Sequence, residues 1–366
     1  GVATVLDWFL GVNGFDRVAG LVGGYFSAIA LPVASNAEVF KVPQIAFGAT
    51  NPFLSDKVAY PMFARTIPPD NIQGAAMWAW MNKFVIPSVV FWYRRREAYG
   101  EGLLQTSLDY ANSAGQPGRV SGIAVELTDE DDADLQLLVE SLDRLRSTGS
   151  KFVMIVFSDP VEITMGMYAM ELEDMLYNSY QILGPDAFGI QGGSEYRPSR
   201  GYPVGTQRFT PVAQGPLYEK YLDMWRLMSP LDVYGQEAVE RYRLDQLYVP
   251  LESGASTALT LSDFQDREPW FFSNFLFDAA YTFVIAINNL LHAGVEAADA
   301  KGLTLLEEVH RTEFEGVTGF VKFDENADRL GDFELWNVLA EGEDLLSVAT
   351  WSASTGNFAF RDTSRQ

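Results

Sequence analysis

Apolar residues along this chain fall into two kinds of run, and the two kinds alternate. Short runs rich in β-branched and aromatic residues occur at 88–93 (SVVFWY) and 151–157 (KFVMIVF). Longer runs have apolar residues at helical spacing, as in 133–149 (ADLQLLVESLDRLRSTG). Strands that alternate with helices are typical of parallel sheets. The pattern therefore predicts an α/β fold with parallel sheets flanked by helices.

The runs place the expected elements along the chain. Helices are predicted at 1–10 (the end of a helix), 27–40, 75–85, 101–115, 133–149, a stretch ending near Tyr180, 216–229, 270–291 and 303–313. Strands are predicted at 19–24, 43–49, 88–93, 120–127, 151–157, 187–193, 319–323 and 332–338. Between about 194 and 268 the alternation gives way to loops. Because no low-complexity linker is present, short crossings are expected to join the parts of the molecule.

The run 270–291 is long and apolar enough to resemble a membrane span. It carries Asp278 near its middle and several amide side chains, and a charged residue at that depth is costly in hydrocarbon. A buried core helix is therefore the better interpretation.

Composition narrows the function. A chain of 366 residues is about right for two domains or one two-lobed unit. Its formal charge of -23 would repel phosphate backbones and anionic lipid, which disfavours nucleic-acid and peripheral membrane roles. The absence of cysteine excludes disulfides, thiolate nucleophiles and cysteine-bound metals.

Three corners between a strand and the next element are candidate binding sites, because ligands of parallel α/β sheets bind where strands end. The first, 23–27 (GGYFS), offers glycines and Ser27 at a predicted helix N-cap. The second, 47–52 (FGATNP), offers small residues and a hydroxyl, which suit a carboxylate or an ammonium group. The third, 189–195 (GIQGGSE), ends in a carboxylate. A plain helix cap and ordinary turns are the alternatives.

Catalytic and metal motifs are weak. His292 and His310 lie outside the three corners, and the chain has neither a G-x-S-x-G elbow nor a phosphate-binding loop. Residues 324–328 imitate the start of a calcium loop, but Arg329 and Leu335 replace the glycine and glutamate that it needs. We therefore expect no cofactor, no metal and no enzymatic activity. An acid–base hydrolase or isomerase remains the catalytic alternative.

The corners lie within a recognisable series of motifs. The stretch 42–70 (VPQIAFGATNPFLSDKVAYPMFARTIPPD) resembles the receptor family ligand-binding region, which has the type I periplasmic-binding-protein fold. This family includes bacterial leucine-type amino-acid-binding proteins and the ectodomains of metabotropic glutamate-type receptors. Further matches follow in the family's order at 98–102 (AYGEG), 277–281 (FDAAY), 314–319 (FEGVTG) and 323–324 (FD). The resemblance covers nearly the whole chain.

The resemblance implies two lobes joined by three crossings, the first near Arg65. Lobe 1 would hold 1–67 and 255–330, and lobe 2 would hold 68–254 and 331–366. The family's pattern begins with a strand, a helix and a second strand. This N-terminal part of lobe 1 is expected to precede the point at which the present sequence starts.

The resemblance also implies ligand contacts. In amino-acid-binding members, a serine at the first corner and an Ala-Thr pair at the second hold the ligand, and these positions are Ser27, Ala49 and Thr50. The acidic residue after the first crossing falls on Asp70, a candidate partner for an ammonium group. The aromatic residue before Gly-Glu falls on Tyr99, which would close over the ligand from lobe 2.

Asp159, which follows the strand 151–157, and Glu195, at the third corner, are further candidates on lobe 2. A zwitterion needs hydroxyls and a helix N-terminus for its anionic end and carboxylates for its cationic end. The expected function is therefore capture or sensing of an amino-acid-like small molecule by closure of the lobes.

The resemblance further implies an extracellular or periplasmic location, a possible homo- or heterodimer through lobe 1, and transduction or transmembrane domains outside this chain. The main alternative is a structural or dimerisation ectodomain that binds no ligand. The bulky pair Tyr25 and Phe26 beside Ser27 favours this alternative, because their side chains would fill the cleft.

Overall fold

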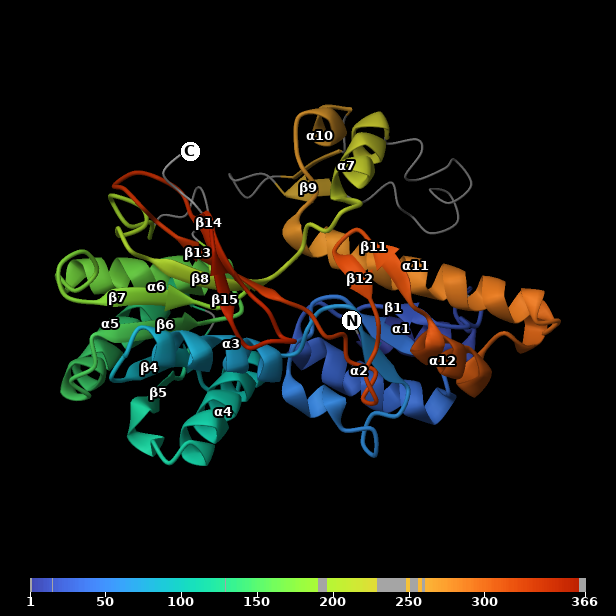
Figure 1. Cartoon of the computed structure of the whole chain (residues 1–366), viewed down its shortest axis with the longest axis horizontal. Helices are drawn as coiled ribbons and strands as arrows, with labels where there is room; N and C mark the ends of the chain where they lie inside the picture. The colour runs from blue at the N-terminus through green and yellow to red at the C-terminus, as the bar shows by residue number, and fades with distance from the viewer. Residues whose placement is uncertain are drawn as a thin grey trace.

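The computed structural model is a two-lobed α/β molecule in which each lobe is built around its own sheet (Figure 1). It describes residues 2–14, 16–128, 130–189, 196–228, 248–250, 256–258 and 261–361. The predicted α/β class, with mostly parallel sheets flanked by helices, is confirmed.

The first lobe, on the right in Figure 1, contains a parallel sheet of three short strands. Its strands, in spatial order, are β1 (Leu21–Val22), β2 (Gln44–Ala46) and β3 (Phe63–Arg65). Its helices are α1 (Val2–Leu10), α2 (Ser27–Phe40), α11 (Phe271–His292) and α12 (Gly302–Arg311). Alanines of α2 pack on one face of the sheet, and α11 and α12 pack on the other. A hairpin of β11 (Phe314–Gly316) and β12 (Gly319–Val321) completes the lobe.

The second lobe contains an eight-stranded sheet in the order β15-β14-β13-β8-β7-β6-β4-β5. The strands are β4 (Val89–Arg94), β5 (Val120–Val125), β6 (Phe152–Val156), β7 (Gln181–Gly184), β8 (Gln207–Pro211), β13 (Phe333–Asn337), β14 (Leu346–Trp351) and β15 (Phe358–Phe360). The helices are α3 (Asp70–Lys83), α4 (Ala98–Ser113), α5 (Asp131–Ser147) and α6 (Pro160–Leu172). The five strands β4 to β8 are parallel, and the last three pair antiparallel. Helices α3 and α4 cover one face, and α5 and α6 cover the other.

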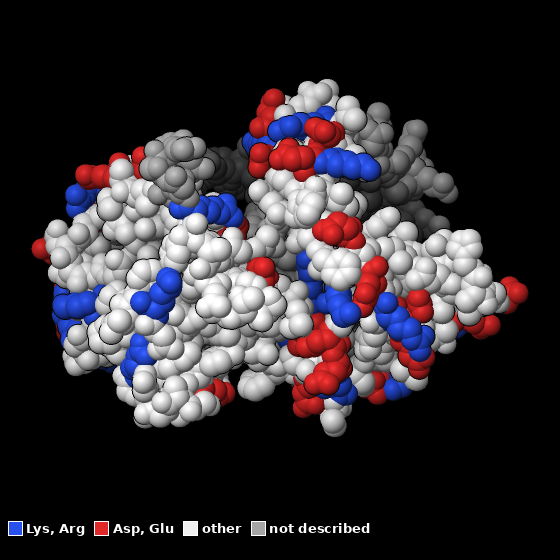
Figure 2. Space-filling view, viewed as in Figure 1, with Lys and Arg blue, Asp and Glu red and all other residues white. Residues whose placement is uncertain are grey.

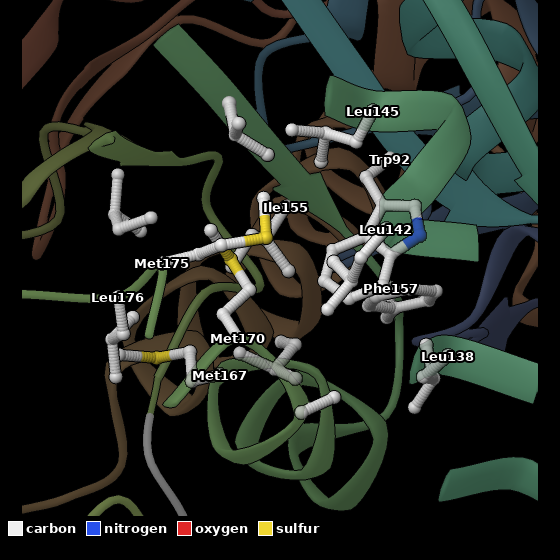
Figure 3. Close-up of a cluster of buried hydrophobic side chains, with 14 of the residues drawn as sticks. Trp92, Leu138, Leu142, Leu145, Ile155, Phe157, Met167, Met170, Met175 and Leu176 are labelled. Carbon is white, nitrogen blue, oxygen red and sulfur yellow. The ribbon is translucent and has the colours of Figure 1, made fainter. Parts of the chain in front are cut away.

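The core beneath α5 and α6 is dense in aromatic and methionine side chains (Figure 3). Trp92 lies fully buried at its centre, and its ring meets Phe157 edge to face. The indole N–H donates to the Ser141 hydroxyl over 2.8 Å, and that hydroxyl donates to the Leu138 carbonyl over 2.7 Å. The core therefore depends on one polar side chain as well as on apolar packing.

Replacement of Ser141 by alanine should destabilise the second lobe by about 1–2 kcal/mol, because it leaves the buried Trp92 N–H without an acceptor. Chemical denaturation followed by tryptophan fluorescence would measure the loss. Ser147→Ala on the same helix is the matched control, because the Ser147 hydroxyl is exposed and donates only to the nearby Arg144 carbonyl. Equal losses in the two variants would contradict the assigned role of Ser141.

The strand predicted at 187–193 is wrong over its described residues, 187–189, and the rest of it lies outside the described residues. The strand at this point of the sheet is β7, six residues earlier, and it ends before Pro185. The described residues 187–189 form no strand; Phe188 instead folds back under Gly184, where an added Cβ would lie 2.0 Å from the Phe188 ring. The alanine-phenylalanine pair is thus a buried anchor after the strand, although its composition resembles a strand.

The region predicted as loops contains the central strand β8. The helix α7 (Tyr218–Leu227) in the same region confirms the helix predicted at 216–229. Tyr218 and Leu222 of α7 pack against Val317 of the first lobe. Beside α7 lie α10 (Ser262–Gln265) and the antiparallel pair β9 (Tyr248–Pro250) and β10 (Ser256–Ala258) (Figure 1). The predicted boundary at 254 lies outside the described residues, and the lobe boundaries stay a prediction.

Among the described residues, α11 is the one helix long and apolar enough to cross a membrane by length and composition. Asp278, on which the core-helix interpretation rests, is fully buried in protein. Its carboxylate accepts the backbone N–H groups of Val317 and Thr318 over 2.8 and 3.0 Å. One face of α11 therefore belongs to the core of the first lobe.

Candidate functional site

The two lobes touch where the loop after β2 meets the start of α4. The Asn51 side-chain amide donates to the Ala98 carbonyl across this boundary. An added Cβ on Gly102 of α4 would lie 2.7 Å from that amide nitrogen. The two lobes are therefore so close here that position 102 has no room for a side chain unless Asn51 moves. The candidate site lies in this closed contact region.

Ser27 and the loop after β2 form one unit. The helix α2 begins at Ser27 itself, so the N-cap residue is Phe26 and the predicted N-cap position of Ser27 is off by one. The Ser27 hydroxyl accepts the backbone N–H of Asn51 over 3.2 Å. The Ala49 carbonyl is already occupied, because it accepts a hydrogen bond of 3.1 Å from Arg65.

Thr50 and Asp70 lie together at the first crossing. The backbone N–H of Asp70 donates to the Thr50 carbonyl over 2.9 Å, and both side chains are buried. Neither carboxylate oxygen of Asp70 has a hydrogen-bond partner among the described residues, and the same holds for the Thr50 hydroxyl and the Gln73 amide oxygen. Three adjacent side chains thus present unpaired acceptor atoms in the protein interior.

Tyr99 joins this group through a residue that the sequence analysis did not identify. Its hydroxyl donates to the carboxylate of Asp186, two residues beyond β7, and both residues are buried. Asp186 therefore occupies the strand end where the sequence analysis expected the third corner and Glu195.

The carboxylates of Asp70 and Asp186 influence one another. Burial, reinforced by the Asp186 carboxylate, raises the pKa of Asp70 well above its ordinary value, and the nearby Thr50 hydroxyl and Arg65 oppose this shift. Burial also raises the pKa of Asp186, opposed by the Tyr99 hydroxyl and by Arg208. A buried acidic pair of this kind favours the approach of a cation.

Arg208 of β8 is a second site residue that the sequence analysis missed. Its guanidinium donates to the main-chain carbonyl of Asp186 and lies 5.8 Å from the centre of the Phe271 ring. Burial lowers the pKa of Arg208 from its ordinary value. This positive group sits beside the acidic pair on the wall that the second lobe contributes.

The Tyr25 side chain occupies the space beside Ser27. Its ring packs against those of Phe26 and Phe272, with centroids 4.6 and 4.8 Å away, and over Gly48, where an added Cβ would lie 2.4 Å from the ring. The cavity left beside Ser27 measures about 20 Å³, room for about one water molecule. An amino acid can therefore enter only if Tyr25 moves or the lobes separate.

Asp159 and Glu195 are the remaining predicted residues. Asp159 is exposed and caps α6, where its carboxylate accepts the Val161 N–H over 2.8 Å. Glu195 lies outside the described residues. The structure thus brings Ser27, Thr50, Asp70 and Tyr99 to one region.

The aspartates of the turn at 324–328, which resembles the start of a calcium loop, already accept hydrogen bonds or form ion pairs within the protein. Asp324 accepts the backbone N–H groups of Asn326 and Asp328, and the Asp328 carboxylate pairs with Arg65 over 2.6 Å. In the part of the chain that the structure describes, no group of three or more histidine, aspartate or glutamate side chains is placed to hold a metal ion.

Comparison with known proteins agrees with this geometry. The model of the receptor family ligand binding region matches residues 2–341. Metabotropic glutamate receptor 8 of Homo sapiens, and likewise that of Mus musculus and Rattus norvegicus, is 40% identical over 62 residues. This stretch is 17% of the chain and 7% of each receptor, so the match covers a small part of those proteins.

Proposed function

Because the chain belongs to the receptor family of ligand-binding regions, we propose that it closes its two lobes around an amino acid or a related small amine or carboxylate. The receptor relatives support this class of ligand, since their name refers to glutamate. The proposed role is sensing or solute capture without catalysis.

One observation carries the proposal. The carboxylate oxygens of Asp70 and the amide oxygen of Gln73 are buried near one another and accept no close hydrogen bond among the described residues, and the Thr50 hydroxyl lies beside Asp70. An unpaired buried acceptor costs about 1–3 kcal/mol, and more when it is charged. A ligand ammonium group carries a positive charge and three donors, which match this set. Tyr99 and Asp186 would enclose it from the second lobe.

The anionic end of the ligand would lie near the start of α2. The helix is 14 residues long, and its N-terminal backbone N–H groups favour a negative charge. The Ser27 hydroxyl accepts one hydrogen bond from Asn51 and keeps its own hydrogen for a ligand carboxylate.

The proposal is tested by thermal denaturation with free amino acids, small amines and small carboxylates. A ligand of the folded state should stabilise it by about 2.7 kcal/mol at a hundredfold excess over its dissociation constant. The rise should need both an amine and a carboxylate, and N-acetylated or esterified versions of an active amino acid are the controls. A flat response from a folded protein would refute the proposal.

Binding should tighten as pH rises. The raised pKa of Asp70 keeps its carboxyl protonated in the empty site above the ordinary aspartate range, whereas a bound ammonium group needs the ionised form. Binding therefore releases a proton, and affinity should increase with pH until the raised pKa of Asp70 is passed. Calorimetry in buffers of different ionisation enthalpy would measure the released proton.

In Asp70→Asn the proton release should become smaller. The pH effect belongs to Asp70 and Asp186 together, because the two carboxyl groups influence each other. A proton uptake on binding, or a release unchanged in the variant, would contradict the assignment.

A ligand-free structural role is the second candidate, and the place of Tyr25 favours it. The Tyr25 ring occupies the space that a ligand would need, within a cluster that also holds Phe47 and Trp270. If this role holds, Tyr25→Ser should destabilise the protein and no amino acid should restore its stability. If the binding role holds, an active amino acid should stabilise the variant at least as well as the parent.

We also propose an extracellular or periplasmic location, a homo- or heterodimer through the first lobe, and transduction or transmembrane domains elsewhere in the full protein. The support is the family and the receptors that contain a similar stretch. Crosslinking with receptor-expressing cells and separate size measurements on the domain would test these points.

A further inference from the structure

A large groove lies at the crossings between the lobes, separate from the cleft of Ser27 and Tyr99. It measures about 1010 Å³ and shares no lining residue with the small cavity beside Ser27. Its walls include Tyr110 of α4 on one side and Phe320 of β12 on the other, so both lobes contribute. Figure 2 shows a furrow between the lobes, with basic and acidic side chains along the edge of the first lobe.

The crossings that form the groove are packed without spare room. An added Cβ on Gly331 would lie 2.6 Å from Pro68, and one on Gly215 would lie 2.1 Å from the Gly319 nitrogen. All four residues line the groove. Because these segments pack closely against one another, the shape of the groove is fixed in this arrangement of the lobes.

The groove wall is rich in apolar and aromatic side chains. Phe275, Phe323 and Trp351 line it, and the Phe320 side chain and Leu330 beside it are 54% and 55% exposed. Exposed apolar side chains gathered in a concave surface of this size are typical of a binding site for a small molecule.

Some polar groups that line the groove have hydrogen-bond partners and others do not. The acidic groups already accept hydrogen bonds: Asp332 from the Ala353 N–H over 2.9 Å, and Glu334 from Ser347 over 3.0 Å and from Arg361. Arg329 Nε and Trp351 Nε1, in contrast, have no acceptor among the described residues.

Both unpaired donors belong to side chains that are at least nine-tenths buried, with Arg329 at 3% and Trp351 at 4% exposure. An unpaired buried donor is costly, so an acceptor supplied by a ligand is stabilising. Lys322 and Arg361 also line the wall, where Lys322 pairs with Glu313 over 2.6 Å and Arg361 pairs with Glu334. The strongly negative chain would repel a polyanion, which limits the ligand to a single anionic group.

We propose that this groove is a second binding site, for a small molecule with an aromatic or apolar body and one anionic, acceptor-rich group such as a carboxylate or sulfonate. A ligand there contacts both lobes, so its affinity depends on their relative position, and by linkage it shifts the closure of the cleft. The site does not depend on the ligand proposed for the cleft.

Two fluorescent probes test the proposal on the whole chain. Anilinonaphthalene sulfonate has an aromatic body and one anionic group, and N-phenyl-1-naphthylamine has the same body without the sulfonate. We expect saturable binding of the sulfonate at one site, about tenfold tighter than binding of the uncharged probe, as one strong polar contact would give. Equal affinities or binding that does not saturate would overturn the proposal.

Matched variants locate the site. Phe320→Ser in the groove should weaken the sulfonate about tenfold, as loss of a buried aromatic contact would. Phe26→Ser, at the mouth of the cleft, is the control, because Phe26 is also an exposed aromatic side chain (43%). Trp351→Phe, checked for folding by circular dichroism, should reduce the preference for the sulfonate by removing the indole donor. Loss of binding in Phe26→Ser, with none in Phe320→Ser, would place the probe in the cleft and refute the groove site.

Discussion

Asp70→Asn should weaken binding of an ammonium-bearing ligand by about 3 kcal/mol, a loss on the order of 100-fold, because it removes the charge that the ammonium group pairs with in the interior. The side chain keeps its shape, loses its charge and exchanges one acceptor oxygen for an NH2 donor. Calorimetry with the amino acid that is active in the thermal experiment measures the loss directly.

The same variant should stabilise the empty protein at neutral and alkaline pH. The folded-state pKa of Asp70 is raised, so its contribution is most favourable below the unfolded pKa and declines as pH rises through the folded pKa. Asparagine does not titrate, and the decline should disappear. The control is Asp159→Asn, whose carboxylate is exposed. Weaker binding in Asp159→Asn than in Asp70→Asn would show that the cation site is elsewhere.

Arg65→Met should cost about 3–5 kcal/mol of folding free energy, the largest loss expected from a single change in the first lobe. Arg65 is fully buried, and its Nε donates to the Asp328 carboxylate over 2.6 Å. Its other nitrogens donate to the carbonyls of Ala49 and Asn51 over 3.1 and 2.9 Å and to the Ser55 hydroxyl. Methionine fills similar space but leaves Asp328 as an uncompensated buried charge.

Urea denaturation of two further variants separates charge from packing. Arg65→Met combined with Asp328→Asn should recover a large part of the loss, because no charge stays unpaired. Arg146→Met removes an exposed pair with Asp143 and Glu173 and should cost less than about 1 kcal/mol. If Arg65→Met is no more harmful than Arg146→Met, the buried pair is not what holds the crossing in place.

The local elements were largely predictable because they depend on nearby residues. The helix predicted at 27–40 has those bounds in the structure, and the helices predicted at 101–115 and 133–149 are displaced by only two or three residues. The helix α3 begins five residues before its predicted start, and α6 ends at Leu172 instead of near Tyr180. The strand β8 was not predictable from its own residues, QRFTP, which carry an arginine and a proline. It forms because β7 and the distant β13 pair with it on both sides.

The same long-range dependence explains the errors at the site. Ser27, Thr50, Asp70 and Tyr99 were found through motifs that resemble a family, and they lie in one region of the fold. Asp186 and the neighbouring Arg208 were missed, because the strand end was placed after 187–193. The signal for Asp186 was present: Pro185 ends the run QILG, and an acidic residue follows directly. The depth of Tyr25 in the cleft depends on tertiary packing and has no local signal.

Asn51 has a consequence for the speed of binding. It is fully buried, and it accepts the Phe53 N–H over 2.8 Å while its amide reaches Ala98 in the other lobe. A molecule in solution cannot pass this contact until the hydrogen bond between the lobes breaks. Entry is then timed by a spontaneous opening of the protein, on the microsecond-to-millisecond scale of such motions, and the frequency of collisions matters less. At high ligand concentration the observed rate would reach a plateau, and the height of that plateau is a property of Asn51 and its neighbours.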